Sequence, residues 1–232
     1  MSDVYNNLEK SMLSIKDYEA IPVIDNGEPL VPIVDTPSLT AEQRGDDMKE
    51  YTGNVVYVRR GTLDRLAKAA DLLIATDDSM ALNVVYGYRA LQVQTRRFET
   101  VRQSLSDQFS GEELDLATHR MVARPDVAGH PTGGAVDIQI LQEGGTMNFG
   151  TGISEFVPDS YTFSPFVGRE AMQNRMLLRT VMMGAGFASF DGEWWHFSFG
   201  DKEWAKYMNQ PNAVYKQLDF EPTMLVDTEK AA

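Results

Sequence analysis

The sequence has no cysteine, few basic residues and no long apolar run. Without cysteine, neither a disulfide nor a thiolate-bound metal can stabilise the fold, and the redox compartment stays open. A membrane-spanning helix needs about 20 consecutive apolar residues. No stretch approaches that length, so we expect no membrane partner. Lys and Arg number 21 against 34 Asp and Glu, a formal net charge of −13, which argues against nucleic acid and anionic membrane surfaces as partners.

The length and the amino terminus set the expected organisation of the chain. Residues 1–20 lack the basic start and apolar stretch of a secretory signal. With Met1 as the native start, we therefore expect a cytoplasmic protein. A chain of 232 residues can form one domain with a sizeable core, and no linker-like composition divides it. We predict a domain over residues 55–220, an extended arm over 1–54 packed on it, and a mobile tail over 221–232.

Local patterns predict an α+β fold. Apolar spacing indicates helices over residues 62–74, with Thr62 as the N-cap, from Arg89 onward, and over 168–186. Residues 82–86 are typical of a strand, and residues 187–199 of a β-hairpin. Because the strands are short and hairpin-like, we expect a small antiparallel sheet flanked by helices in a single domain.

Proline sets the expected course of the first part of the chain. Pro22, Pro29, Pro32 and Pro37, with scattered acids, indicate an extended segment rather than a helix over residues 21–54. Such a segment covers a surface, and whether it also roofs an active site is left open.

Two segments carry the most unusual chemistry. Residues 129–140 place His130 in a turn-rich stretch before a short strand, in which Asp137 shares a face with Gln139. A carboxylate in that strand needs a cation, donors or a metal, because burying it unpaired costs roughly several kcal/mol. Residues 193–197, Glu-Trp-Trp-His-Phe, add a glutamate and an imidazole among large apolar side chains.

Each of these residues also has an ordinary interpretation. A histidine beside glycine and proline is usually a solvated loop residue, and a strand aspartate is usually hydrogen-bonded locally. Two of the three histidines nevertheless fall in these segments. Together, His130, Asp137, His196 and the spare Glu193 are the inventory of a catalytic zinc site with an open position for water. The remaining histidine, His119, is expected to be solvated and is not a candidate ligand.

Strand geometry adds one expectation. In a regular strand Glu193 and His196, three positions apart, face opposite sides of the sheet. Both can reach one metal only if the strand is bulged or kinked between them, or if Glu193 lies in the turn and leans over. We predict such an irregularity.

The motifs resemble a known family. His-x2-Gly-x-Ala-x-Asp from His130, Glu-x-Trp-His from Glu193 and an upstream Gly87-Tyr88-Arg89 resemble the zinc D-alanyl-D-alanine dipeptidases of the VanX type. These belong to a D,D-peptidase family with a hedgehog-like fold. The likeness covers residues 20–218, and three ordered motifs together are specific.

The resemblance implies a mechanism. One Zn²⁺ per chain, held by His130, Asp137 and His196, lowers the pKa of its bound water towards about 7. Glu193 takes the proton and later delivers it to the leaving amine. Arg89 stabilises the oxyanion of the tetrahedral intermediate, a task that suits a guanidinium. The implied substrate is D-alanyl-D-alanine or a related short D-amino-acid dipeptide.

Departures from the family pattern leave the substrate open. Family members usually have serine where Gly129 precedes the first zinc ligand, and aspartate where Tyr86 precedes Gly-Tyr-Arg. The acid expected to receive the substrate ammonium aligns with Ser154. Candidate substrate contacts are Gly129, Ser154, Glu155, Tyr88 and Trp195. The preferred dipeptide, the oligomeric state and the role, whether cell-wall recycling, antibiotic resistance or nutrient use, are not fixed by the sequence.

Two alternatives remain. A D,D-carboxypeptidase or cell-wall endopeptidase would need an open cleft and export, which the missing signal disfavours. A non-catalytic, zinc-stabilised binding module would have no use for Glu193 and Arg89. Water at the fourth coordination position would favour catalysis, whereas a fourth protein ligand would favour a structural metal.

Overall fold

A computed structural model describes residues 2–225. The predicted mobile tail over residues 221–232 therefore lies largely outside the described residues. The helices are α1 Ser2–Ser11, α2 Ile15–Tyr18, α3 Asp46–Thr52, α4 Arg60–Ile74, α5 Leu91–Leu105, α6 Gly111–His119, α7 Arg169–Gly184 and α8 Lys202–Tyr207, with 3-10 turns at His130–Thr132, Pro158–Ser160 and Pro222–Met224. None of the described helices is long and apolar enough to cross a bilayer.

The strands form two sheets. They are β1 Leu30–Pro32, β2 Leu39–Ala41, β3 Tyr57–Arg59, β4 Met80–Tyr86, β5 Ala135–Gln142, β6 Gly145–Thr146, β7 Ala188–Ser189 and β8 His196–Ser198. The larger sheet has the order β2-β4-β5-β8-β7, with β6 paired to β5, and the smaller pairs β1 with β3. β2 runs parallel to β4, whereas the other pairs are antiparallel. The fold is mixed α+β, as predicted.

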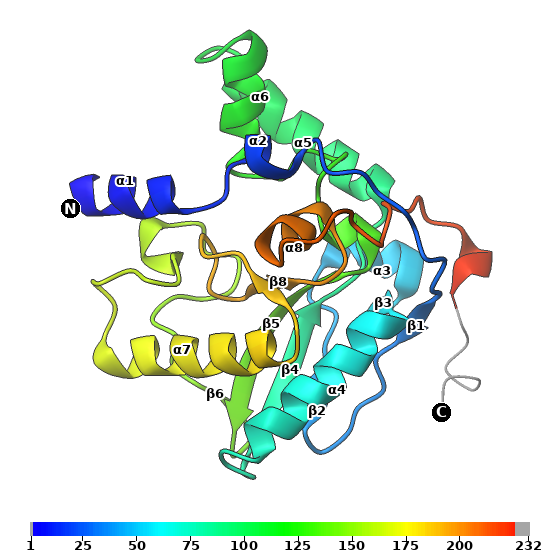
Figure 1. Cartoon of the computed structure of the whole chain (residues 1–232), viewed down its shortest axis with the longest axis vertical. Coiled ribbons are helices and arrows are strands. Elements are labelled where there is room, and N and C mark those ends of the chain that lie inside the picture. The colour runs from blue at the N-terminus through cyan, green and yellow to red at the C-terminus, as the bar shows by residue number, and fades with distance from the viewer. Residues whose placement is uncertain (1, 226–232) are drawn as a thin grey trace.

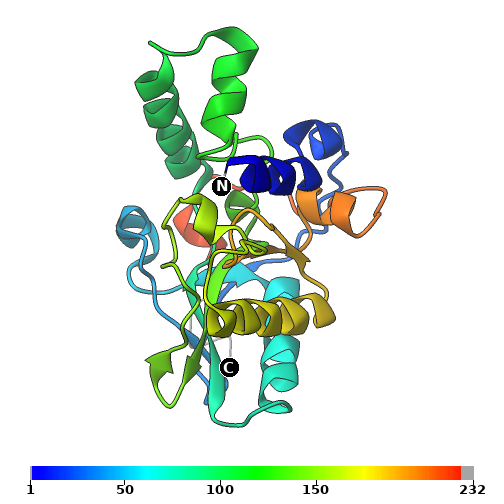
Figure 2. The same ribbon diagram turned by 90° about the vertical axis from the view of Figure 1, so that its left-hand side faces the viewer.

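The helices flank the sheet unequally. α4 and α7 pack against each other beside β4 and β5 (Figure 1). α5 and α6 pack together and project from one end of the molecule, at the top of Figure 2. The main core lies between the sheet and the pair α4 and α7, where Leu66, Leu73, Leu178 and Met182 meet Val136, Ile138 and Ile140 of β5.

The other face of the sheet is polar although it is buried. Alternation along β5 turns Asp137 and Gln139 away from the apolar core. Gln139 Nε2 donates to Asn83 Oδ1 (3.0 Å), and Asn83 Nδ2 donates to Thr40 Oγ1 (3.0 Å). A row of hydrogen-bonded polar side chains thus crosses β5, β4 and β2, and Asp137 lies on the same face two residues from Gln139 along β5.

Several local expectations need correction. The predicted extended arm over residues 1–54 is not extended throughout, because α1 and α2 precede residue 21 and α3 lies within residues 21–54. Thr62 is not the N-cap, because α4 begins at Arg60 and its N-cap is Arg59. α5 begins at Leu91, two residues beyond Arg89.

His119 is not a solvated residue either. It is partly buried, its Nδ1 accepts a hydrogen bond from the Arg124 backbone N–H (3.0 Å), and its Nε2 lies 3.3 Å from the Tyr18 hydroxyl. Burial lowers the pKa of His119 to about 4. It is a satisfied structural histidine that joins α6 to α2.

Arg175 on α7 is buried and holds the loop between β6 and α7 in place. Its Nε donates to the carbonyl of Phe149 (2.8 Å), and its Nη1 donates to that of Tyr161 (2.8 Å). The loop in turn packs on Trp194, whose ring stacks on Phe149 at 4.0 Å and whose Nε1 donates to Thr151 Oγ1 (2.9 Å). Arg175 therefore supports the segment that precedes His196.

Replacing Arg175 by methionine would leave the buried Phe149 carbonyl without a donor, whereas the Tyr161 carbonyl would keep the Ser164 N–H (2.9 Å). We expect the free energy of unfolding to fall by about 2 kcal/mol, since one unsatisfied buried group costs about 1–3 kcal/mol. Urea unfolding followed by tryptophan fluorescence measures it. Arg169→Met, at the exposed start of the same helix, is the matched control and should change stability by less than about 0.5 kcal/mol. Equal losses in both variants would contradict this explanation.

Candidate metal centre and active site

Pairing in the large sheet brings three side chains into one row. Asp137 on β5 is the direct partner of His196 on β8, and on the other side it is the partner of Tyr86 on β4. Directly paired residues project from the same face of a sheet. The carboxylate thus lies between an imidazole and a phenol.

His130 reaches this row from the turn before β5. Its Nδ1 lies 2.8 Å from the Gly87 carbonyl, which can only accept, so Nδ1 carries the proton and Nε2 has the free lone pair. Nε2 lies 3.4 Å from Asp137 Oδ1. The Arg89 backbone N–H also donates to the His130 carbonyl (3.2 Å). The Gly-Tyr-Arg segment therefore fixes both the position and the tautomer of His130.

The three predicted ligands form a compact cluster. His196 Nδ1 lies 3.1 Å from the same Asp137 oxygen that faces His130, and the potential ligand atoms of all three residues lie within 4.8 Å of one another. Zinc bonds of about 2.0–2.1 Å in a tetrahedron place neighbouring ligand atoms about 3.3 Å apart. The observed 3.1 and 3.4 Å fit that spacing. Two imidazoles and one carboxylate are also the donors that zinc prefers.

The protonation states agree with a cation site. Burial lowers the pKa of His130 to about 4, despite the nearby Asp137 charge. Burial opposes the charged forms of Asp137 and His196, but the attraction and hydrogen bonds of the imidazoles keep the pKa of Asp137 below its usual range, and Asp137 raises the pKa of His196 to about 9. At neutral pH the metal-free cluster therefore has a free lone pair on His130 and an anion beside it.

Glu193 lies outside the strand that bears His196. β8 begins at His196, and Glu193 belongs to the preceding turn, where its N–H donates to the Phe190 carbonyl and its carbonyl accepts from the His196 N–H. The predicted irregularity is confirmed in the form of a turn. Burial raises the pKa of Glu193 to about 7, with the charges of His196, Asp137 and Arg89 all acting on it.

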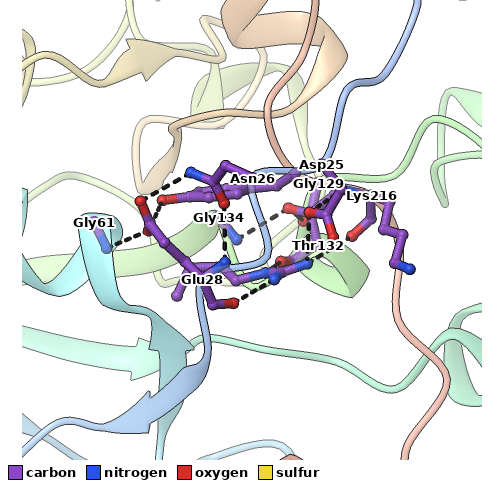
Figure 3. Close-up of polar contacts among 10 residues, drawn as sticks. Asp25, Asn26, Glu28, Gly61, Gly129, Thr132, Gly134 and Lys216 are labelled. Carbon is purple, nitrogen blue, oxygen red and sulfur yellow. Dashed lines mark hydrogen bonds and ion pairs between the residues drawn. The ribbon is translucent and has the colours of Figure 1, made fainter.

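A second, structural network holds the turn that carries His130. Arg59, buried at the end of β3, donates through Nε to the Thr132 carbonyl (2.8 Å), through Nη1 to the Glu28 carbonyl (2.5 Å) and through Nη2 to Asp25 Oδ1 (3.3 Å). Thr132 Oγ1 donates to the Gly129 carbonyl, as Figure 3 shows. The amino-terminal segment is thereby tied to the metal-binding turn.

Comparison with known families decides the assignment. A family model described as D-Ala-D-Ala dipeptidase, of peptidase family M15, matches residues 49–216. The chain belongs to this family. It is by class a zinc-dependent metallopeptidase. The family predicted from the three motifs is confirmed.

Individual relatives agree. The D-alanyl-D-alanine dipeptidase of Synechocystis sp. is 31% identical over 236 residues, covering 89% of this chain and 96% of the relative. That of Escherichia coli is 37% identical over 168 residues, covering 69% and 79%. Among solved structures, VanYB in complex with D-alanine-D-alanine is 16% identical, covers 81% of this chain and 92% of its own, and has a TM-score of 0.41, too distant a likeness to support a functional argument.

The candidate substrate contacts differ in their burial and in their hydrogen-bond partners. Tyr88 is buried, and its hydroxyl donates to the Leu218 carbonyl (2.9 Å). Ser154 and Glu155 are exposed, and Glu155 Oε2 accepts from the Gly152 N–H (2.8 Å). Trp195 is buried beside His196, with the exposed Phe156 ring at 6.1 Å. Their contacts with a substrate stay predictions.

Other residues of the site gave no sequence signal. Asp47 accepts from the Tyr86 hydroxyl, and Gln94 accepts from the Arg89 guanidinium. Asp47 belongs to α3, which was not predicted. Gln94 belongs to α5, and the apolar periodicity of that helix says nothing about a functional role for a polar residue. The acidic first turn of α3, with Asp46 and Asp47, was the one local sign of a helix there.

The structure gives a steric reason for glycine at position 129. A Cβ at this position would lie 2.4 Å from Asp201 Oδ2 and 3.0 Å from Ala135 Cβ. Asp201 cannot easily move, because its Oδ1 caps α8 by accepting from the Trp204 N–H (2.8 Å) and also accepts from Ser198 (3.0 Å). The buried carboxylate therefore fills the space of a side chain at 129.

Gly129→Ala should destabilise the protein by about 2 kcal/mol, the usual cost of overpacking a rigid site. Urea unfolding of the metal-free protein measures this without contribution from zinc. The matched control is Gly152→Ala, whose added Cβ meets only Glu155 Oε2 at 3.7 Å and should cost less than about 0.5 kcal/mol. A Gly129→Ala protein as stable as the parent would refute the packing argument.

Proposed function

We propose that this protein hydrolyses D-alanyl-D-alanine or a related short D-amino-acid dipeptide, with one zinc ion held by His130, Asp137 and His196. The observation that carries the proposal is the cluster of three ligands, with an acid of raised pKa in the turn beside it. Membership of the dipeptidase family supports the same reaction. The relatives named above as D-alanyl-D-alanine dipeptidases support the substrate class.

The number of ligands in the cluster is that of a catalytic metal site. Within residues 2–225 the group that could hold a metal has three members, which is the ligand number of catalytic rather than structural zinc sites. The three side chains keep 9–14% of their surface accessible, so the cluster is not sealed from solvent. A bound zinc ion supplies Lewis acidity and makes water acidic near neutral pH.

Two side chains have separate tasks in the reaction: one carries the proton, and the other stabilises the negative charge that develops on the substrate. Glu193, whose pKa lies near 7 before a metal binds, accepts a proton from the attacking water and passes it to the leaving amine. Arg89, whose charge acts on both His130 and Glu193, donates to the carbonyl oxygen as it becomes an oxyanion. Gly129, Ser154, Glu155, Tyr88 and Trp195 stay candidates for substrate contact, and a cytoplasmic location stays a prediction.

Metal binding tests the ligand set without any assay of activity. His196→Ala should weaken zinc binding by more than about 100-fold, because two ligands remain. Glu193→Gln should keep the parental zinc content. His119→Ala, which removes the histidine outside the cluster, is the matched control and should also keep it. Competition with a chromophoric chelator measures all three, and zinc retained by His196→Ala would exclude this ligand set.

Hydrolysis tests the reaction. The zinc-loaded protein should release D-alanine from D-alanyl-D-alanine, a chelator should stop the release, and Glu193→Gln should lower kcat by about 1,000-fold through loss of the proton carrier. A D-amino-acid dipeptide panel then maps the breadth of the pocket. Release only from longer peptides would indicate a D,D-carboxypeptidase, and zinc binding without any hydrolysis would indicate a non-catalytic module.

A further inference from the structure

The guanidinium of Arg89 is held on two sides. Its Nε donates to the Tyr86 hydroxyl (3.1 Å), and its Nη1 donates to Gln94 Oε1 (2.7 Å). Gln94 is itself fixed, because its Nε2 donates to the Ala123 carbonyl (2.6 Å). Among residues 2–225, Nη2 of Arg89 has no protein acceptor. It is the nitrogen left to meet a ligand.

Tyr86 is held as firmly as the arginine that it supports. Its hydroxyl donates to Asp47 Oδ1 (3.0 Å), while Asp47 Oδ2 accepts from Arg97 Nε (2.5 Å). Because the hydroxyl proton is committed to Asp47, its lone pairs face Arg89. Gly45 at the start of α3 leaves space for the ring, since a Cβ there would lie 2.0 Å from Tyr86 Cε2.

A bulge in β4 turns Tyr86 towards the active site. Up to Val84, which pairs with Ile138, the register of β4 and β5 is regular, and continuing it would place Tyr86 opposite Val136. The register instead shifts by one residue, so Tyr86 pairs with Asp137. A bulge of this kind moves a side chain to the other face of a sheet. The Tyr86 ring consequently lies edge-on to His130, with ring centroids 5.2 Å apart.

We propose that Tyr86 is the positioning residue of Arg89: its hydroxyl, oriented by Asp47, fixes the guanidinium so that Nη2 donates to the oxyanion formed from the substrate carbonyl. This inference rests on the proposed peptidase function. Tyr86 itself does not touch the reacting atoms. Without its hydroxyl, Nε would lose its acceptor, and the arginine would rotate towards water or towards Asp47.

The first test is Tyr86→Phe, which keeps the ring and removes the hydroxyl. A misplaced arginine weakens only an interaction made in the transition state, so kcat should fall by about 10- to 100-fold while KM stays within about twofold. The zinc content should be unchanged. Tyr207→Phe is the matched control, because its hydroxyl also accepts from an arginine, Arg179 (2.9 Å), and its kcat should equal that of the parent.

A double mutant identifies the pathway of the effect. In an Arg89→Lys background, Tyr86→Phe should lower kcat little further, because the guanidinium it positions is already gone. Asp47→Asn provides a second variant, and should lower kcat in the same direction by a smaller factor. A full kcat in Tyr86→Phe, or losses that multiply in the double mutant, would overturn the proposal.

A spectroscopic readout separates this inference from the proposed function. In the zinc-loaded parent, the Arg89 Nε–H should give a protected ¹⁵N–¹H signal, assigned by its loss in Arg89→Lys, and Tyr86→Phe should lose the same signal to solvent exchange. A parent protein without peptidase activity would reject the proposed function, while this signal would still decide the role of Tyr86. Survival of the signal in Tyr86→Phe would reject that role.

Discussion

One buried carboxylate, Asp137, constrains much of this structure. A buried anion in a strand is tolerable only beside cations or donors. His196 supplies a charged donor from the neighbouring strand, and His130 turns a free lone pair towards the same oxygen, where a bound cation would complete the site. Register decides whether that happens, since a slip of one residue would exchange Asp137 with its apolar neighbours Val136 and Ile138. The alternation that fills the core between the sheet and the two helices thus also forms the metal cluster on the opposite face.

The cluster further depends on backbone groups from distant parts of the chain. The Gly87 carbonyl selects the tautomer of His130, and the Arg89 N–H holds the His130 carbonyl. Arg59 binds the carbonyl two residues further on and connects it to Asp25. A ligand in a turn has little rigidity of its own, so these hydrogen bonds provide the preorganisation that a strand gives to Asp137.

Sequence reasoning succeeded where the signal is local. Period-two alternation placed Asp137 on one face with Gln139, and the spacing of Glu193 and His196 required a bulge, a kink or a turn, of which the structure has the turn. It failed where tertiary contacts decide. Thr62 has the chemistry of a cap, yet α4 starts earlier at Arg60, and His119 is satisfied by contacts with other segments. The bulge in β4 has no marker in the sequence, so no sequence pattern showed that Tyr86 faces the site.

The two departures from the family pattern nearest the cluster share one physical explanation. At Gly129 the missing side chain is replaced in space by the carboxylate of Asp201 on α8. At Tyr86, where relatives usually have an acid, the phenol hydroxyl connects Arg89 to the carboxylate of Asp47 on α3. In both cases a carboxylate from another element is involved. Asp201 occupies the space that a side chain at position 129 would fill, and Asp47 accepts the hydrogen bond of the Tyr86 hydroxyl. The motifs alone therefore do not describe this site, because side chains from α3 and α8 fill the space at Gly129 and bind the hydroxyl of Tyr86.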